Sequence, residues 1–238
     1  MQDQHIASAF DRDLEAIQAQ IMKMGGLVEE AIQLAATALE TRDEELANAV
    51  READRKIDAL DELVNDEAAR VIALRQPIAT DLRTVLSVMK ISGNLERCGD
   101  YAKNLAKRTS VLVQMPPVGG TGRSIRRMAH EVQLMLKDAL DAYVRRDVDL
   151  AERVRQHDLD VDQMYNAMFR EFLTHMMEDP RSITACMHLH FIAKNIERTG
   201  DHVTSIAEQV IYLVTGEMPE ESRPKDVRTS FVLGESKK

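Results

Sequence analysis

The sequence has few of the residues that build disulfide-linked or sheet-rich proteins. It contains no tryptophan, and aromatic residues make up only 4% of the chain. Alanine, leucine, methionine, glutamate and arginine are abundant instead, and these residues favour long helices over sheets. The two cysteines, Cys98 and Cys186, are far apart and have no Cys or His at zinc-finger spacing. We therefore predict neither a disulfide framework nor a structural zinc site.

Long apolar runs and a surplus of positive charge are missing too. No stretch approaches the roughly 18 apolar residues of a membrane-spanning helix, and residues 1–10 lack the basic and apolar order of a secretory leader. We expect a cytoplasmic protein without direct membrane insertion. The formal net charge is −9, with acidic and basic residues interspersed. This argues against binding to nucleic acid and favours cations or basic protein surfaces as partners.

The apolar residues that are present recur at alternating steps of three and four. This spacing is typical of helices with a coiled-coil-like seam. Thr41, with Glu44 three residues later, predicts a capping box that begins a second helix. Pro77 ends that helix, and Thr80 is expected to cap a third. The same plan of three helices then repeats in the second half of the chain.

A linker rich in Pro and Gly separates the two halves. We predict an all-α fold of two tandem three-helix antiparallel bundles, six long helices in total, related by internal duplication. The predicted division is 1–113 for the first bundle, 114–123 for the linker, 124–216 for the second bundle and 217–238 for a C-terminal tail that is mobile or serves for docking.

The strongest sign of duplication is an acidic heptapeptide that occurs twice. Residues 94–100 (NLERCGD) return 101 positions later as residues 195–201 (NIERTGD). A Glu and an Asp four residues apart lie on one face of a helix. Asp54 and Asp58 form another such pair, and they align with Asp158 and Asp162 at a shift of 104.

The hinges between helices bring these pairs to the same level. An antiparallel neighbour folded back at Ile78 presents Asp58 opposite the Glu96–Asp100 pair, and the second hinge does the same for Asp158 and Asp162. Gly99 and Gly200 let the helices approach closely beside the acids. We predict a cation site in each half. The eight candidate ligands are Asp54, Asp58, Glu96, Asp100, Asp158, Asp162, Glu197 and Asp201.

Oxygen ligands suit hard ions such as magnesium, manganese, calcium or iron. The alternative is a solvated acidic face whose charge is balanced by nearby Arg and Lys residues. A zinc site is a weaker hypothesis, because the histidines of the second half include no close pair four residues apart. A ferritin-like di-iron site would need Glu-x-x-His motifs in a four-helix bundle, and the sequence has neither.

The duplicated plan, the two Glu-Arg-x-Gly-Asp segments and the hinge sequence 75–83 (RQPIATDLR) together resemble the PhoU family over about residues 5–215. The resemblance implies a noncatalytic, cytoplasmic regulator that represses the phosphate-starvation response and links the phosphate ABC transporter ATPase to a sensor histidine kinase. It also implies frequent homodimers, and multinuclear metal clusters in some members. Iron, zinc, manganese and magnesium are the candidate ions.

The second half departs from the family pattern at two places. Asp81, Leu82 and Arg83 have no counterpart after Pro180, and Asn104 becomes Ser205. The two sites therefore need not match in metal content or affinity. A carboxylate-ligated metalloenzyme and a metal-storage bundle remain as alternative functions.

Overall fold

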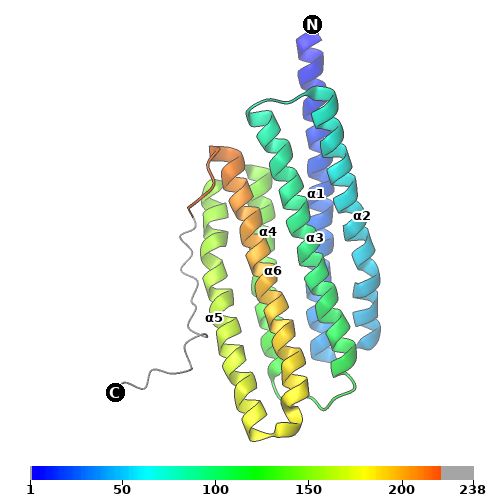
Figure 1. Ribbon diagram of the computed structural model, residues 1–238, viewed down its shortest axis with the longest axis vertical. Coiled ribbons are helices and arrows are strands. Elements are labelled where there is room, and N and C mark those ends of the chain that lie inside the picture. The colour runs from blue at the N-terminus through cyan, green and yellow to red at the C-terminus, as the bar shows by residue number, and fades with distance from the viewer. Residues whose placement is uncertain (1, 221–238) are drawn as a thin grey trace, which may run out of the picture.

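The computed structural model describes residues 2–220 and is helical throughout, with no strand in this range. It contains six long helices and one short 3-10 turn. These are α1 (Gln2–Thr41), α2 (Glu44–Arg75), α3 (Thr80–Leu112), α4 (Thr121–Arg145), α5 (Val148–Glu178), η1 (Pro180–Ser182) and α6 (Ile183–Thr215). The predicted all-α fold with a repeated three-helix unit is confirmed (Figure 1). Most of the predicted tail, residues 221–238, lies outside the described residues.

The turns that begin α2 and α5 are copies of one another. Arg42 and Arg146 adopt left-handed backbone conformations with φ of 58° and 56°. The next residues, Asp43 and Asp147, cap the helices, and each carboxylate accepts a hydrogen bond of 2.9 Å from the backbone N–H three residues on. The duplication therefore extends to the local chemistry of the turns.

Two of the predicted caps are wrong. Thr41 is the last residue of α1, and its hydroxyl donates to the Thr37 carbonyl at 2.9 Å. The left-handed residue that follows places Asp43, and not Thr41, before the first free N–H groups of α2. Thr80 is already helical, and Ala79 precedes α3 with a φ of 48° and no side-chain cap. Ala79, with its positive φ, therefore occupies the N-cap position that was predicted for Thr80.

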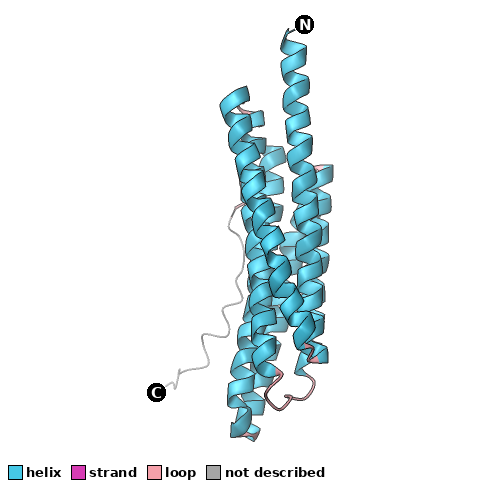
Figure 2. Ribbon diagram, turned by 90° about the vertical axis from the view of Figure 1, so that its right-hand side faces the viewer, coloured by secondary structure: helices cyan, strands magenta, loops and turns pink. Residues whose placement is uncertain are grey.

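The two copies pack against each other along their length. We call α1, α2 and α3 the first lobe and α4, α5 and α6 the second lobe. Helix α3 lies along α6 and α1 lies along α4, whereas α2 and α5 pack mainly against helices of their own lobes. Figure 2 shows the helices running side by side in one elongated bundle. Among the described residues, no helix combines the length and apolarity needed to cross a bilayer.

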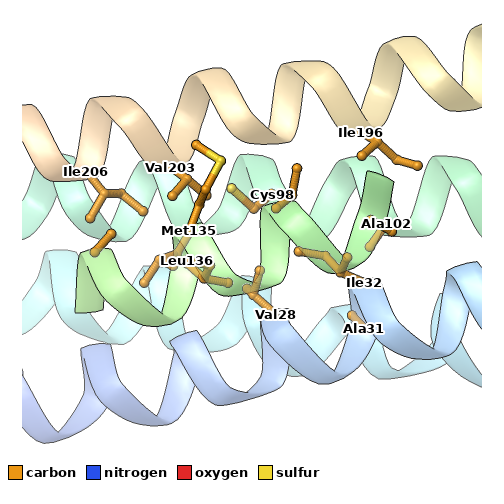
Figure 3. Packing of buried hydrophobic residues seen from close by; sticks show 14 of the residues in the cluster. Val28, Ala31, Ile32, Cys98, Ala102, Met135, Leu136, Ile196, Val203 and Ile206 are labelled. Carbon is orange, nitrogen blue, oxygen red and sulfur yellow. The ribbon is translucent and has the colours of Figure 1, made fainter. Parts of the chain in front are cut away.

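One hydrophobic core joins the lobes. In Figure 3, Leu136 of α4 lies beside Val28 of α1, and Met135 of α4 extends toward Val203 of α6; all belong to the one core. The Sγ of Cys98 lies 3.9 Å from the Thr199 carbonyl oxygen of α6. Cys98 and Thr199 are the same position of the repeat, so the lobes are related by a pseudo-two-fold axis that passes near this contact.

The two helix caps provide a test of the fold. We expect Asp43→Ala and Asp147→Ala each to lower the free energy of unfolding by about 1 kcal/mol, because each leaves an N–H of the first turn without its partner. Asp→Asn at the same positions keeps an acceptor and serves as the control. Urea unfolding followed by circular dichroism measures the difference. Alanine variants as stable as the asparagine variants would contradict the role assigned to the caps.

Candidate functional site

The first lobe brings its four predicted carboxylates together between α2 and α3. Asp54 is only 3% exposed, and a Cβ on Gly99 would lie 3.0 Å from Cδ1 of Ile57 and 3.5 Å from Oδ1 of Asp54. The absence of a side chain at Gly99 therefore lets α2 pack closely here through Ile57, next to the buried acid. Asp58 and Glu96 interact electrostatically with Asp100 and with each other. The arrangement is the one that the hinge geometry predicts.

A lysine sits among these acids. The Nζ of Lys103 lies 2.5 Å from Oδ2 of Asp54 and 3.5 Å from Oδ1 of Asp100. This hydrogen bond to Asp54 raises the pKa of the lysine. Arg97 adds a second cation, with its Nη1 at 3.3 Å from Oδ2 of Asp100. Lys103 and Arg97, both on α3, therefore neutralise part of the negative charge of the first-lobe cluster.

Two acids of this cluster remain electrostatically unfavourable when ionised. Burial raises the pKa of Asp58, and the neighbouring Asp54 carboxylate raises it further. Burial likewise raises the pKa of Glu96, with Asp100 as the next largest cause. Carboxylates that hold their protons more tightly than usual are sites where an added cation gains free energy.

The second lobe repeats the acids between α5 and α6. Asp158 is 7% exposed, and a Cβ on Gly200 would lie only 2.9 Å from its Oδ1. Burial raises the pKa of Glu197, whereas Lys194, with its Nζ at 2.6 Å from Oε1, lowers it. Asp201 and Asp162 lie close enough to raise it again. The predicted residues are again brought together.

The lysines are not repeated, although the acids are. At the shift of 101 that relates α3 to α6, Lys103 corresponds to Thr204, and Lys194 corresponds to Gly93. Lys103 bridges two aspartates in the middle of its cluster, whereas Lys194 pairs with Glu197 and lies over the ring of Tyr165. We did not predict Lys194. Comparing the mismatched positions of the repeat, and not only the matched ones, would have found it.

The donor set has the chemistry of a hard-cation site, but the side chains are arranged around lysines. Within residues 2–220, no three Asp, Glu, His or Cys side chains lie in positions that could hold a metal ion together. Oδ1 of Asp54 and Oε2 of Glu197 are nevertheless buried without a hydrogen-bond partner. Such oxygens fit a cation ligand, because an unpaired buried acceptor is costly. Metal binding at the eight predicted residues stays a prediction.

The histidines of the second lobe have separate partners. Nε2 of His157 lies 3.2 Å from Glu131, and Nδ1 of His188 lies 3.4 Å from Arg108. His190 packs against the rings of Tyr165, Phe169 and Phe191. Nδ1 of His202 lies 2.8 Å from the Asn94 side chain of the first lobe. They do not converge on one point, so the weaker zinc hypothesis gains no support.

Comparison with known proteins gives a consistent family match. The PhoU domain matches residues 21–109 and again residues 125–210. A Caulobacter vibrioides protein described as a phosphate-specific transport system accessory protein PhoU homolog is 46% identical over 222 residues, covering 93% of this chain and 96% of the relative. A homolog of the same description from Zymomonas mobilis is 47% identical over 227 residues, covering 95% of each.

Two solved structures of PhoU proteins are similar to this chain over most of its length. The crystal structure of PhoU from Pseudomonas aeruginosa superposes with a TM-score of 0.84 at 40% identity, covering 87% of this chain and 100% of the other. The phosphate transport system regulatory protein PhoU from Streptococcus pneumoniae superposes with a TM-score of 0.82 at 29% identity, covering 89% and 99%.

The glycines beside the acids can be tested against a matched control. A Cβ on Gly200 would displace the buried Asp158, whereas a Cβ on Gly93 meets nothing within 4 Å. We expect Gly93→Ala to stabilise the protein by about 0.5–1 kcal/mol through helix propensity. Gly200→Ala should instead lower the free energy of unfolding, because overpacking costs about 1–3 kcal/mol. Urea unfolding measures the free energy of unfolding of both variants. Equal stabilisation by the two substitutions would show that the close approach of the helices at Gly200 is unimportant.

Proposed function

This chain belongs to the PhoU family of accessory and regulatory proteins of phosphate transport, and from this membership we propose that it represses the phosphate-starvation response when phosphate is plentiful. It acts in the cytoplasm as an adaptor between the ATPase subunit of the phosphate transporter and a sensor histidine kinase. The observation that carries the proposal is the match of both lobes to the PhoU domain. The family consists of non-enzymatic regulators, so a metalloenzyme is not favoured.

The shape of the molecule suits an adaptor. The hinge between α2 and α3 and the hinge between α5 and α6 lie at opposite ends of the bundle (Figure 1). Each exposes large apolar side chains: Leu74 is 63% and Ile78 is 78% exposed at the first hinge, and Met177 is 77% exposed at the second. Exposed apolar groups of this size are common at protein contacts. Two such ends, far apart, support binding to two partners.

For this function we keep the domain boundaries that were predicted from the sequence. Residues 1–113 and 124–216 form the two domains, joined by the linker 114–123, and the protein works as a homodimer. The acidic clusters bind cations such as iron, zinc, manganese or magnesium, with Asp54, Asp58, Glu96 and Asp100 in the first lobe and their counterparts in the second. When bound, such an ion supplies positive charge that neutralises the clustered carboxylates.

The regulatory function is tested by deleting the gene. We expect phosphate-starvation genes to be expressed in high phosphate in the deletion strain and repressed again by the wild-type gene. A Leu74→Ser, Ile78→Ser double variant should fail to restore repression, because it removes the apolar contact surface of one end. Leu159→Ser, at a partly exposed position in the middle of α5, is the control and should restore it. A reporter fusion measures expression, and unchanged expression on deletion would refute the proposal.

The role of Lys103 in cation binding is tested separately. Lys103→Thr introduces the residue found at the equivalent position of the second lobe. We expect it to bind Mn²⁺ in the first lobe at least about tenfold more tightly, because the competing charge is gone. Lys107→Thr removes a charge one turn further along α3 and is the control. Calorimetry of the purified protein with Mn²⁺ gives affinity and stoichiometry.

Two further variants link the result to the ligands. Asp100→Ala should abolish the gain produced by Lys103→Thr, and Asp201→Ala should reduce binding in the second lobe. Equal metal content in the wild type and in both alanine variants, measured by elemental analysis, would show that the site assignment is wrong.

A further inference from the structure

A hollow of about 390 Å³ lies between α1 and α4 and is unrelated to the acidic clusters. Because α1 belongs to the first lobe and α4 to the second, the hollow spans both. In Figure 1, α1 and α4 lie behind α3 and α6, so the hollow is on the side of the bundle away from the α3–α6 contact. Arg123, Arg126, Arg127 and His130 line it from α4, and Glu40 lines it from α1.

The charge of this hollow is opposite to that of the chain. The protein carries a formal net charge of −9, yet three arginines gather here against one glutamate. Nη1 of Arg126 lies 2.5 Å from Oε2 of Glu40. The guanidinium groups of Arg123 and Arg127 form no hydrogen bond or ion pair with any residue of the range 2–220. Within the described part of the chain, these two cations therefore have no paired acid.

The position of the arginines on α4 is unfavourable by itself. The N-terminus of a helix carries partial positive charge and prefers acidic side chains. The first turns of α2 and α5 follow this rule with Glu44, Glu45 and Asp149, whereas the first turn of α4 contains no acid. The three arginines occupy its first two turns. An anion bound there would relieve both the repulsion among the arginines and their repulsion by the helix.

The cluster is specific to one copy of the repeat. At the shift of 104 that aligns Ile21 with Ile125, the three arginines correspond to Ala19, Met22 and Lys23. The equivalent helix of the first lobe lacks this group of three arginines. Duplication of that helix therefore does not account for their presence at this end of α4.

A second hollow of about 240 Å³ adjoins the first and shares Glu40 and Arg123 with it. Its walls include Leu112, Val118 and Leu189 together with the linker between α3 and α4. The first hollow thus offers guanidinium groups, and the second offers apolar surface. Their volumes are in the range of small-molecule sites when taken together.

We propose that the α1–α4 hollow binds a small molecule that carries a phosphoanhydride. Guanidinium groups bind phosphate oxygens in pairs of hydrogen bonds, and the partial positive charge at the start of α4 favours an anion there. Arg123 and Arg127 hold the phosphates, and Arg126 is positioned by Glu40 at their edge. Inorganic pyrophosphate fills the arginine hollow alone, whereas a nucleoside diphosphate also reaches the apolar hollow beside it.

Calorimetry of the full-length protein with pyrophosphate, ADP and inorganic phosphate tests the proposal. We expect pyrophosphate or ADP to bind with a stoichiometry of one per chain and to bind more tightly than inorganic phosphate. Arg123→Gln and Arg127→Gln should each weaken binding about tenfold or more, because each removes a charged hydrogen-bond donor. Arg145→Gln is the control, since Arg145 lies on the same helix but pairs with Asp141, 3.5 Å away and outside the hollow. Thermal unfolding verifies that every variant is folded.

Each outcome of the calorimetry leads to a different conclusion about the ligand. Tighter binding of ADP than of pyrophosphate identifies a nucleotide as the ligand class, and equal binding identifies the phosphoanhydride alone. No binding of either at millimolar concentration overturns the proposal. Equal weakening by Arg145→Gln also overturns it, because binding would then follow overall charge. So would tighter binding of an acidic Glu-rich peptide, which would make the hollow a protein contact. None of these outcomes depends on the regulatory function proposed above.

Discussion

The crossing of α3 and α6 positions both acidic clusters and holds the lobes together. Cys98 and Thr199, equivalent in the repeat, meet at this crossing. When a duplicated helix packs antiparallel against its own copy, equivalent residues lie at equal distances on either side of the contact. Asp100 and Asp201 therefore both lie within one turn of it. Any change in the angle or spacing of these two helices moves both clusters at once, because packed cores shift as units.

The crossing also connects the clusters electrostatically. The ring of Tyr101, next to Asp100 in the chain, lies 5.6 Å from the ring of His202, next to Asp201. Burial lowers the pKa of His202, and Arg97 of the first lobe lowers it further, whereas Asp201 raises it. A charge that binds at one cluster thus acts on groups that belong to the other. The two clusters are neighbours in one electrostatic environment, although their carboxylates come from different halves of the chain.

Local periodicity was sufficient to predict the helices, and the positions of the hinges were sufficient to predict the meeting of the carboxylates. Apolar spacing identified the core positions, and the level of Asp58 against Glu96 followed from helix length and antiparallel packing. The features that we missed depend on neighbours that the pattern does not specify. Asp43 caps α2 because a left-handed residue precedes it, which no periodicity reveals. The hollow at Arg123 forms only because α4 packs against α1 of the other lobe, a contact between segments far apart in the sequence.

Comparison of the two lobes shows which residues of the acidic clusters are repeated and which are not. Burying ionised acids such as Asp54 and Asp158 destabilises a protein unless a cation accompanies them. If the acids served only to bind a structural lysine, each acid and its lysine would form a matched pair in both copies. Instead the acids recur in both lobes, whereas Lys103 and Lys194 stand at different positions. The clustered carboxylates are therefore what the two lobes share, and the positions of the lysines are where the two clusters differ.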